Sequence, residues 1–388
     1  MNSVLPLILS SCVSFAAVCI IHPQLVRIAL QKQIVDRPNE RKLQKNPVPT
    51  MGGTAVFFGI AVGMASIGFM ADCSSLFIVF IALLLMLYLG TIDDILDVSP
   101  AVRLAVQLIA VAMLMFIGGY SLDDLHGLWG CNAIPIAAAL PLTLFAVVGI
   151  INAMNLIDGV DGLSSGLCIL YCSIFGTVCL LAGDTGMTVM CISAIGALVP
   201  FFMHNAFGRT SKMFIGNGGT MLMGIMLSVI VMAMVGDSEF RPLFDARGCS
   251  VVAFSLAVLS SPVFDTLRVM LRRILHGASP FMGDKTHLHH MFIHWGYSHV
   301  GTTLRIIALN IFVIGVWALS AYCGASADVQ FYIVIATGII VTTGIYEAAA
   351  AVERRYPETA ARFISYNFRT KPKRDGIFLF LQKLMDNL

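Results

Sequence analysis

Charged residues are scarce in this sequence, and the shortage excludes an ordinary soluble domain. Asp, Glu, Lys and Arg make up only 12% of the 388 residues, whereas 58% are hydrophobic and the mean hydropathy is +0.86. The first apolar run lacks preceding basic residues and a small-residue cleavage site before a polar segment, so we expect it to be retained as a membrane span. The chain is therefore predicted to be an integral membrane protein.

Other familiar patterns are missing as well. The ten cysteines show no spacing typical of disulfide frameworks, no P-loop ending of Gly-Lys-Ser/Thr occurs, and we find no repeat of fixed period. The net charge of +2 is itself uninformative. No nucleic-acid partner is expected. We predict one transmembrane domain over residues 1–348, followed by a basic tail over residues 349–388.

Long apolar runs recur along the whole chain and predict an all-α polytopic membrane protein. A helix needs about 20 predominantly apolar residues to cross a bilayer. We expect eleven transmembrane helices, near residues 4–26, 52–70, 75–91, 101–119, 134–151, 163–182, 187–203, 218–235, 249–266, 302–323 and 329–347. An odd number of spans places the two termini on opposite sides of the membrane.

The basic residues fix the orientation of these spans. If the N-terminus lies outside, all of the 24 lysines and arginines except Arg241 and Arg247 fall on the inner side. Because Lys and Arg accumulate in cytoplasmic loops, we predict an outer N-terminus and a cytoplasmic C-terminus. The segments richest in polar residues and glycines, 31–54, 92–100, 152–162, 204–220 and 265–301, then share the cytoplasmic side, where we expect the active face.

The tail carries much of the remaining positive charge. Its basic residues include Arg354, Arg355, Arg362, Lys371, Lys373 and Arg374. Such a segment suits a helix lying on an anionic lipid surface. A simple topology anchor is at least as good an interpretation of the same charges.

The most concentrated polar motif is INAMNLIDGVDGL, residues 151–163. Asn152, Asn155, Asp158 and Asp161 recur at three-residue steps, which on a helix lie on adjoining parts of one face. The glycines that follow suggest that the helix frays or turns there. Desolvating two carboxylates and two amides is costly unless a cation or a polar ligand meets them, so we interpret the motif as half of a metal-dependent site.

A second acidic group, Asp93 and Asp94, stands where the third predicted span ends. Alone, these carboxylates would be a solvated helix terminus. Asp158 and Asp161 are expected on the same face, and clustered carboxylates raise each other's proton affinity unless a divalent cation is present. The combination favours Mg²⁺ binding or general-base chemistry.

Two glycine-containing segments could receive phosphate. Lys45 precedes the turn at Gly52, and Gly216 belongs to the glycine-rich entry of the eighth predicted span. Backbone N–H groups at a helix start, together with a nearby cation, favour an anion. A positive-inside anchor and helix-packing glycines explain the same residues equally well, so the composition leaves both interpretations open.

Three histidines gather within four residues of the last inner segment. The concentrated donors are Asp284, Lys285, His287, His289 and His290. A zinc site is one interpretation, but no cysteine or fourth ligand stands at the usual spacing. The other interpretation is that the imidazoles donate hydrogen bonds to phosphate oxygens or to a nucleotide. His294 and His299 are interpreted as bystanders.

In this order the motifs resemble those of the polyprenyl-phosphate N-acetylhexosamine-1-phosphate transferases. The resemblance covers residues 36–290 and rests on DD at 93–94, NAMNLIDGVDG at 152–162, FIGN at 214–217 and HLHH at 287–290. The branch that it resembles most uses UDP-N-acetylglucosamine and undecaprenyl phosphate. The muramoyl-pentapeptide enzymes usually carry a fourth consecutive histidine, so the HLHH motif favours UDP-N-acetylglucosamine as the donor. Other UDP-N-acetylhexosamine donors stay open.

The resemblance implies transfer of a sugar phosphate from a UDP-sugar to undecaprenyl phosphate in the bacterial cytoplasmic membrane, with Mg²⁺ or Mn²⁺ as the metal and a homodimer as one assembly. By family pattern the metal ligands are Asn155, Asn217 and Asp94. The catalytic carboxylates are Asp93, Asp94, Asp158 and Asp161. The substrate-binding residues are Lys45, Asn152, Gly216, Asp284, Lys285, His287, His289 and His290.

One position departs from the family pattern. The family usually has Asp where this chain has Asn217, and an amide oxygen brings no negative charge to a metal. A catalytically impaired scaffold homologue is therefore a second hypothesis. An ion-coupled transporter is a third, although the acidic residues crowd the predicted inner boundary instead of the midplane and no inverted repeat is visible.

Overall fold

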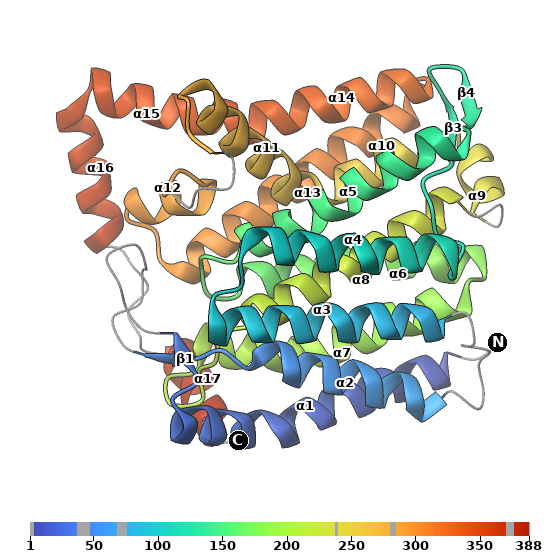
Figure 1. The fold of residues 1–388 in the computed structure, drawn as a ribbon. Helices are drawn as coiled ribbons and strands as arrows, with labels where there is room; N and C mark the ends of the chain where they lie inside the picture. Colours follow the sequence, from blue (N-terminus) through green and yellow to red (C-terminus); the bar gives the residue numbers. More distant parts are fainter. Residues whose placement is uncertain are drawn as a thin grey trace.

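Antiparallel helices packed side by side make up most of the computed structural model, which describes residues 4–36, 47–67, 76–236, 240–279, 285–369 and 376–387 (Figure 1). Eight helices in these ranges are long and apolar enough to cross a membrane, and a bent pair brings the number to nine. The prediction of an all-α polytopic membrane protein is confirmed in this coarse form. The only strands in the described ranges are two short antiparallel pairs.

Each predicted span corresponds to an apolar helix or helix pair. The eight long ones are α1 (Leu5–Lys32), α3 (Leu76–Leu96), α5 (Ile136–Leu156), α6 (Leu163–Ala182), α7 (Thr185–Phe207), α8 (Gly216–Gly236), α13 (His299–Tyr322) and the run of α14 (Ala327–Ile339), η1 (Ile340–Gly344) and α15 (Ile345–Arg355). Two apolar helices are shorter, α2 (Gly52–Ile67) and α4 (Pro100–Phe116). The total of eleven crossings and their orientation stay predictions.

The predicted ninth span is broken. Its two halves, α10 (Val251–Val258) and α11 (Ser260–Leu275), meet at an angle of 76°. The break frees the amide of Ser261 to donate to Oδ1 of Asn310 on α13, and the side chain of Asn310 donates to the carbonyl of Val258. Buried polar side chains thus satisfy the backbone groups that the bend releases.

Helix α8 lies at the centre of the bundle, and its whole apolar stretch is buried, whereas Gly216 and Asn217 at its start are partly accessible. It packs against α2, α3 and α5, which surround it in Figure 1. Small residues make this close packing feasible, because a Cβ atom at Gly90 of α3 would collide with the backbone at Asn217 and Gly218. The N-terminus of α8 is therefore held in contact with the C-terminal end of α3.

The helix ends segregate into two groups. At one end, which we call the site end, lie the C-termini of α1, α3, α5 and α7 and the N-termini of α2, α6, α8 and α13. The opposite end carries β3 (Asp124–Leu128), β4 (Cys131–Ala133) and α9 (Arg241–Asp245). Arg241 lies there, because its guanidinium contacts Asn132 and Asp124.

The tail packs against the site end. Helix α16 (Pro357–Arg369) reaches α12 (Leu288–His294), where the Asn367 amide donates to the carbonyl of Trp295. Helix α17 (Gly376–Asn387) packs on α7, with the rings of Phe378 and Phe207 5.5 Å apart. A short antiparallel pair, β1 (Val35–Asp36) with β2 (Val48–Pro49), lies nearby. The predicted boundary near residue 348 falls within a continuous helical run, and a role on lipid stays a prediction.

Candidate functional site

A cavity of about 460 Å³ is present at the site end, where separate polar motifs of the sequence meet. Its walls come from α3, the turn after α5, the segment between α7 and α8, and the N-terminal parts of α12 and α13. The predicted site residues in the lining are Asp94, Asn155, Asp158, Asp161, Gly216, Asn217 and His290. These seven residues come from four separate motifs, which the structure brings together in one site.

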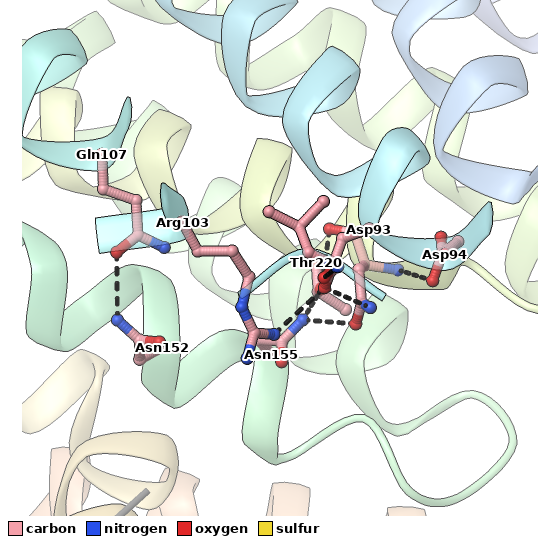
Figure 2. A network of polar contacts seen from close by, with 9 residues as sticks. Asp93, Asp94, Arg103, Gln107, Asn152, Asn155 and Thr220 are labelled. Carbon is pink, nitrogen blue, oxygen red and sulfur yellow. Dashed lines mark hydrogen bonds and ion pairs between the residues drawn. The ribbon is translucent and has the colours of Figure 1, made fainter. Parts of the chain in front are cut away.

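Asn217 lies at the base of the cavity, and Asp93 is buried directly behind it. Nδ2 of Asn217 donates to Oδ2 of Asp93 at 2.9 Å, and Oδ1 of Asn217 accepts from Nδ2 of Asn155 at 2.8 Å. Arg103 of α4 donates to the same Asp93 oxygen at 3.0 Å, and Figure 2 shows the guanidinium reaching toward it. Asp93 is buried and does not line the cavity, so its contacts suit a positioning role.

Asp94 faces the cavity from the next position of the chain. Its Oδ1 accepts the backbone N–H of Asn217 at 3.1 Å, at the start of α8 (Figure 2). Gly216 has a φ of 70°, and a Cβ atom there would collide with Oδ2 of Asp94. The glycine thus allows the carboxylate to approach the N-terminus of α8, where the helix dipole favours negative charge.

The turn after α5 supplies two further carboxylates. Helix α5 ends at Leu156, as the glycines of the motif predict, and Asp158 accepts a hydrogen bond from the Ser164 hydroxyl at 2.6 Å. Burial raises the pKa of Asp158 to about 6, the Ser164 hydrogen bond opposes this shift, and the charge of Asp161 adds to it. A carboxylate of this kind is sensitive to any cation placed beside it.

Asp161 has the opposite electrostatic character. Its Oδ2 lies 2.6 Å from Nζ of Lys212 and 2.8 Å from Nδ1 of His299. Burial alone would raise the pKa of Asp161, but the hydrogen bond and charge of His299 and the charge of Lys212 together lower it. Asp158 therefore has no cationic partner, whereas Asp161 is kept ionised by Lys212 and by its contact with His299.

The histidine motif is fixed by a buried carboxylate that the sequence analysis did not single out. Nδ1 of His287 lies 2.9 Å from Oδ2 of Asp265 on α11, and Arg268 donates to the other oxygen at 2.7 Å. Within the described residues, Nε2 of His287 and Nδ1 of His289 are buried without a hydrogen-bond partner. The pKa of His289 lies well below its usual value because of burial and of its histidine neighbours, so its ring is neutral at physiological pH.

Not every predicted residue reaches the cavity. Asn152 points away, because its Nδ2 donates to the carbonyl of Val148 at 2.7 Å and to Gln107 of α4 at 3.3 Å. Figure 2 shows the contact with Gln107. Lys285 lines a separate cavity of about 350 Å³ that His290 also borders. Lys45 and Asp284 lie outside the described residues, so their roles stay predictions.

The structure adds residues that the sequence analysis passed over. His299 is not a bystander, because its imidazole contacts Asp161 and lines the cavity, whereas His294 pairs with Glu353 at an exposed position. Lys212 lies in a segment that offers no motif of its own. Lys212 and its partner Asp161 are 51 residues apart in the sequence, so no local pattern reveals their contact. The only local signal was the position of Lys212 four residues before Gly216.

The cavity offers oxygen donors to a cation. Among the described residues no group of three or more His, Cys, Asp or Glu side chains is placed to hold a metal ion. The donors are mixed, with carboxylates of Asp94 and Asp158 and amides of Asn155 and Asn217. A hard cation that keeps several water ligands, such as Mg²⁺, fits this set better than zinc does.

Gly159 provides a test of how the two motifs fit together. A Cβ atom there would collide with the buried His289 imidazole. We expect Gly159→Ala to lower the thermal unfolding midpoint by several degrees, because packed interiors do not absorb an extra methyl group. Gly149→Ala on α5 is the matched control, because a Cβ atom there meets nothing within 4 Å. Equal effects of the two alanines would disprove the contact.

A polytopic membrane protein with a polar site at one end of its bundle is the class that the fold and the cavity define. The protein-family model described as glycosyl transferase family 4 matches residues 76–235 of this chain. A Bacillus subtilis (strain 168) protein described as "Probable undecaprenyl-phosphate N-acetylglucosaminyl 1-phosphate transferase" is 30% identical over 319 residues, 82% of this chain and 84% of that protein. The Escherichia coli (strain K12) undecaprenyl-phosphate alpha-N-acetylglucosaminyl 1-phosphate transferase is 30% identical over 278 residues, 70% of this chain and 72% of its own.

A third relative agrees. The Yersinia pestis protein with the same description is 30% identical over 277 residues, 70% of this chain and 73% of that protein. The chain therefore belongs to glycosyl transferase family 4, the polyprenyl-phosphate N-acetylhexosamine-1-phosphate transferases. The resemblance inferred from the motifs is confirmed.

Proposed function

We propose that the chain transfers N-acetylhexosamine-1-phosphate, with N-acetylglucosamine as the favoured sugar, from a UDP-sugar to undecaprenyl phosphate. The observation that carries this proposal is the convergence of Asp94, Asp158, Lys212 and two histidines, His290 and His299, on one cavity beside an apolar bundle. The descriptions of the relatives support the same reaction. Downstream, the lipid-linked sugar would begin O-antigen or a related surface polysaccharide.

In the proposed reaction an oxygen of the lipid phosphate attacks the β-phosphorus of the UDP-sugar. The bond between that phosphorus and the oxygen bridging to UMP breaks, UMP leaves with the electron pair, and a lipid-linked pyrophosphate remains. The chemistry requires two anions to meet, so positioning and charge neutralisation dominate it. Lys212 supplies positive charge at the cavity wall, and Asp94 is placed to orient the attacking phosphate.

We propose that the reaction depends on Mg²⁺, and we expect Mn²⁺ to substitute for it. Asp94, Asn155 and Asn217 would hold the ion, with Asp158 close enough to add charge. When bound, the ion supplies the neutralisation of phosphate charge that the chain's own cations do not provide. Asp93 would then keep Asn217 in place through its hydrogen bond with the amide.

The proposed cellular setting is the bacterial cytoplasmic membrane, with the site end facing the cytoplasm. The positions of Arg241 and Arg247, the two basic residues predicted outside, support this orientation, because α9 and the segment after it lie at the opposite end. A cytoplasmic site would meet the soluble UDP-sugar directly. A homodimer stays a prediction.

The direct test is an assay of the purified chain in lipid nanodiscs. Undecaprenyl phosphate and radiolabelled UDP-N-acetylglucosamine, another UDP-N-acetylhexosamine or UDP-N-acetylmuramoyl-pentapeptide are supplied with Mg²⁺, and lipid-linked product and UMP are measured. We expect equimolar product and UMP from UDP-N-acetylglucosamine, abolished by EDTA and restored by Mg²⁺ or, at a lower rate, Mn²⁺. Product from another donor alone would change the proposed substrate.

Asn217 favours one competing function, that of a scaffold homologue without turnover. Both ends of its amide are already engaged, by Asp93 and by Asn155, and it contributes no charge. The absence of product with every donor in the same assay would favour this reading or an ion-coupled transporter. Ion flux into sealed vesicles would then separate the two.

A further inference from the structure

The segment between α7 and α8, residues 208–215, connects the C-terminal tail to the cavity. It carries Lys212, whose Nζ lies 2.6 Å from Oδ2 of Asp161. The side chain of Asn205 ties the same segment to the acidic turn, because its Oδ1 accepts the N–H of Gly162 at 2.6 Å and its Nδ2 donates to the carbonyl of Met213 at 2.9 Å. A change in this segment therefore reaches the cavity directly.

One oxygen of Asp386, near the end of α17, gathers the first half of this segment. Oδ1 accepts the backbone N–H groups of Arg209 and Thr210 at 2.9 Å each and that of Ser211 at 3.1 Å. The hydroxyl of Ser211 donates to the same oxygen at 3.1 Å. Three successive N–H groups that converge on one oxygen form an anion-binding nest, which here is filled by the chain's own carboxylate.

The electrostatics of Asp386 agree with this geometry. Burial would raise its pKa, but the hydrogen bonds donated by the backbone of residues 209–211 outweigh burial and lower it. The carboxylate is thus ionised at neutral pH, and each bond that it accepts is charge-assisted.

Helix α17 is itself anchored on the bundle. Met385 is buried, and the ring of Phe378 meets that of Phe207 at the end of α7. From the other side, Nε2 of His22 on α1 lies 2.8 Å from the carbonyl oxygen of Ser211. The segment is therefore held between the first helix and the last one.

We propose that Asp386 is a positioning residue, through which the C-terminal helix latches the segment 208–215 and presents Lys212 to the phosphates of the nucleotide sugar. The proposal rests on the proposed function for its substrate, but the latch itself can be tested without turnover. Helix α17 would then help to position a site residue, a role that the apolar and basic sequence of the tail does not suggest.

Trypsin provides the test that is independent of activity. Arg209 is exposed, and the N–H of the Thr210 peptide bond that trypsin would cut is one of those bonded to Asp386. We expect Asp386→Ala to speed cleavage after Arg209 at least about fivefold, measured by mass spectrometry on protein in nanodiscs, because cleavage needs local opening. Asp386→Asn, which keeps the shape but not the charge, is expected in between.

Asn387→Ala is the matched control, because Asn387 is the exposed neighbour on the same helix and plays no part in the latch. Its cleavage rate is expected to equal that of the wild type. Equal rates for Asp386→Ala and Asn387→Ala would overturn the latch. Faster cleavage in Asp386→Ala at an unchanged thermal unfolding midpoint supports it and excludes general unfolding.

Kinetics then test whether the latch acts through Lys212. In the wild-type background we expect Asp386→Ala to raise the KM for the UDP-sugar about fivefold with little change in kcat. In a Lys212→Ala background the same substitution is expected to change KM less than twofold, since coupled residues are not additive. Full additivity would overturn the route through Lys212. A wild-type protein without turnover would refute the proposed function alone, and the cleavage rates would still decide the latch.

Discussion

Asp158→Asn is expected to lower turnover about a thousandfold while leaving the protein folded. Asn has nearly the same volume and still accepts the hydrogen bond that the Ser164 hydroxyl donates at 2.6 Å. What it lacks is the negative charge at the cavity wall. If Asp158 holds the nucleotide or its cation, that charge contributes mainly when the reacting phosphates are in place.

The measurement is the initial rate of lipid-linked product at saturating donor, together with the thermal unfolding midpoint. Asp97→Asn is the matched control, because Asp97 is an exposed carboxylate at the end of α3 and does not line the cavity. Its φ of 50° is one that Asn adopts readily. An Asp158→Asn protein that keeps more than about a tenth of the wild-type rate would remove Asp158 from the reaction.

Asn217→Asp is expected to lower the Mg²⁺ concentration for half-maximal turnover about tenfold. The new carboxylate would face Oδ2 of Asp93, which now accepts a hydrogen bond from the Asn217 amide at 2.9 Å. Two carboxylates this close repel each other unless a proton or a cation lies between them. The substitution therefore adds affinity for the ion and makes the empty site less stable.

Two measurements follow from that argument. In EDTA, the thermal unfolding midpoint of Asn217→Asp should fall by several degrees below the wild type, and millimolar Mg²⁺ should restore it. Asn132→Asp at the opposite end of the bundle adds the same charge far from the cavity and should change neither quantity. If Asn217→Asp has an unchanged Mg²⁺ dependence, the side chain at 217 is not a ligand, and Asp94 is left as the principal donor.

The sequence predicted the meeting of its motifs better than the direction of each side chain. Three-residue spacing suggested one shared face for Asn152 and Asn155, yet only Asn155 reaches the cavity. Asn152 lies almost one turn earlier on α5, where its Nδ2 donates to the Val148 carbonyl and to Gln107. Helix α5 then ends at Leu156, so that Asp158 and Asp161 reach the cavity from a turn and not from the same helix. Helical spacing says nothing about side chains beyond the last turn.

Contacts between distant segments were the harder part. His299 and Lys212 were missed because each is a single residue without a local pattern, and their shared partner Asp161 belongs to another loop. Asp265 was missed for the same reason, since its contact with His287 lies inside a folded cluster. Local sequence carries residue type and spacing, whereas these pairs depend on how whole helices pack.

Hydropathy located the apolar segments but not their shape. The segment near 249–266 was predicted as one span, although Pro262, which has no N–H to donate to the Val258 carbonyl, was a local signal for its 76° bend. What hydropathy does not reveal is that Asn310 of a later helix donates to that carbonyl instead. For the C-terminal tail, too, the sequence indicated the character of the segment but not its packing. Its charges suggested a lipid surface, but an amphipathic pattern does not reveal that α17 packs on α7.

The burial of α8 has a consequence for inhibitor design. Because α8 is enclosed on all sides, its first residues offer a small molecule an unyielding floor at Asn217. The cavity walls around it carry Asp161 on the turn after α5, Lys212 on the segment before α8 and His299 at the start of α13. A compound designed for this cavity can therefore direct a polar group at the Asn217 amide and a charged group at the Asp161–Lys212 pair.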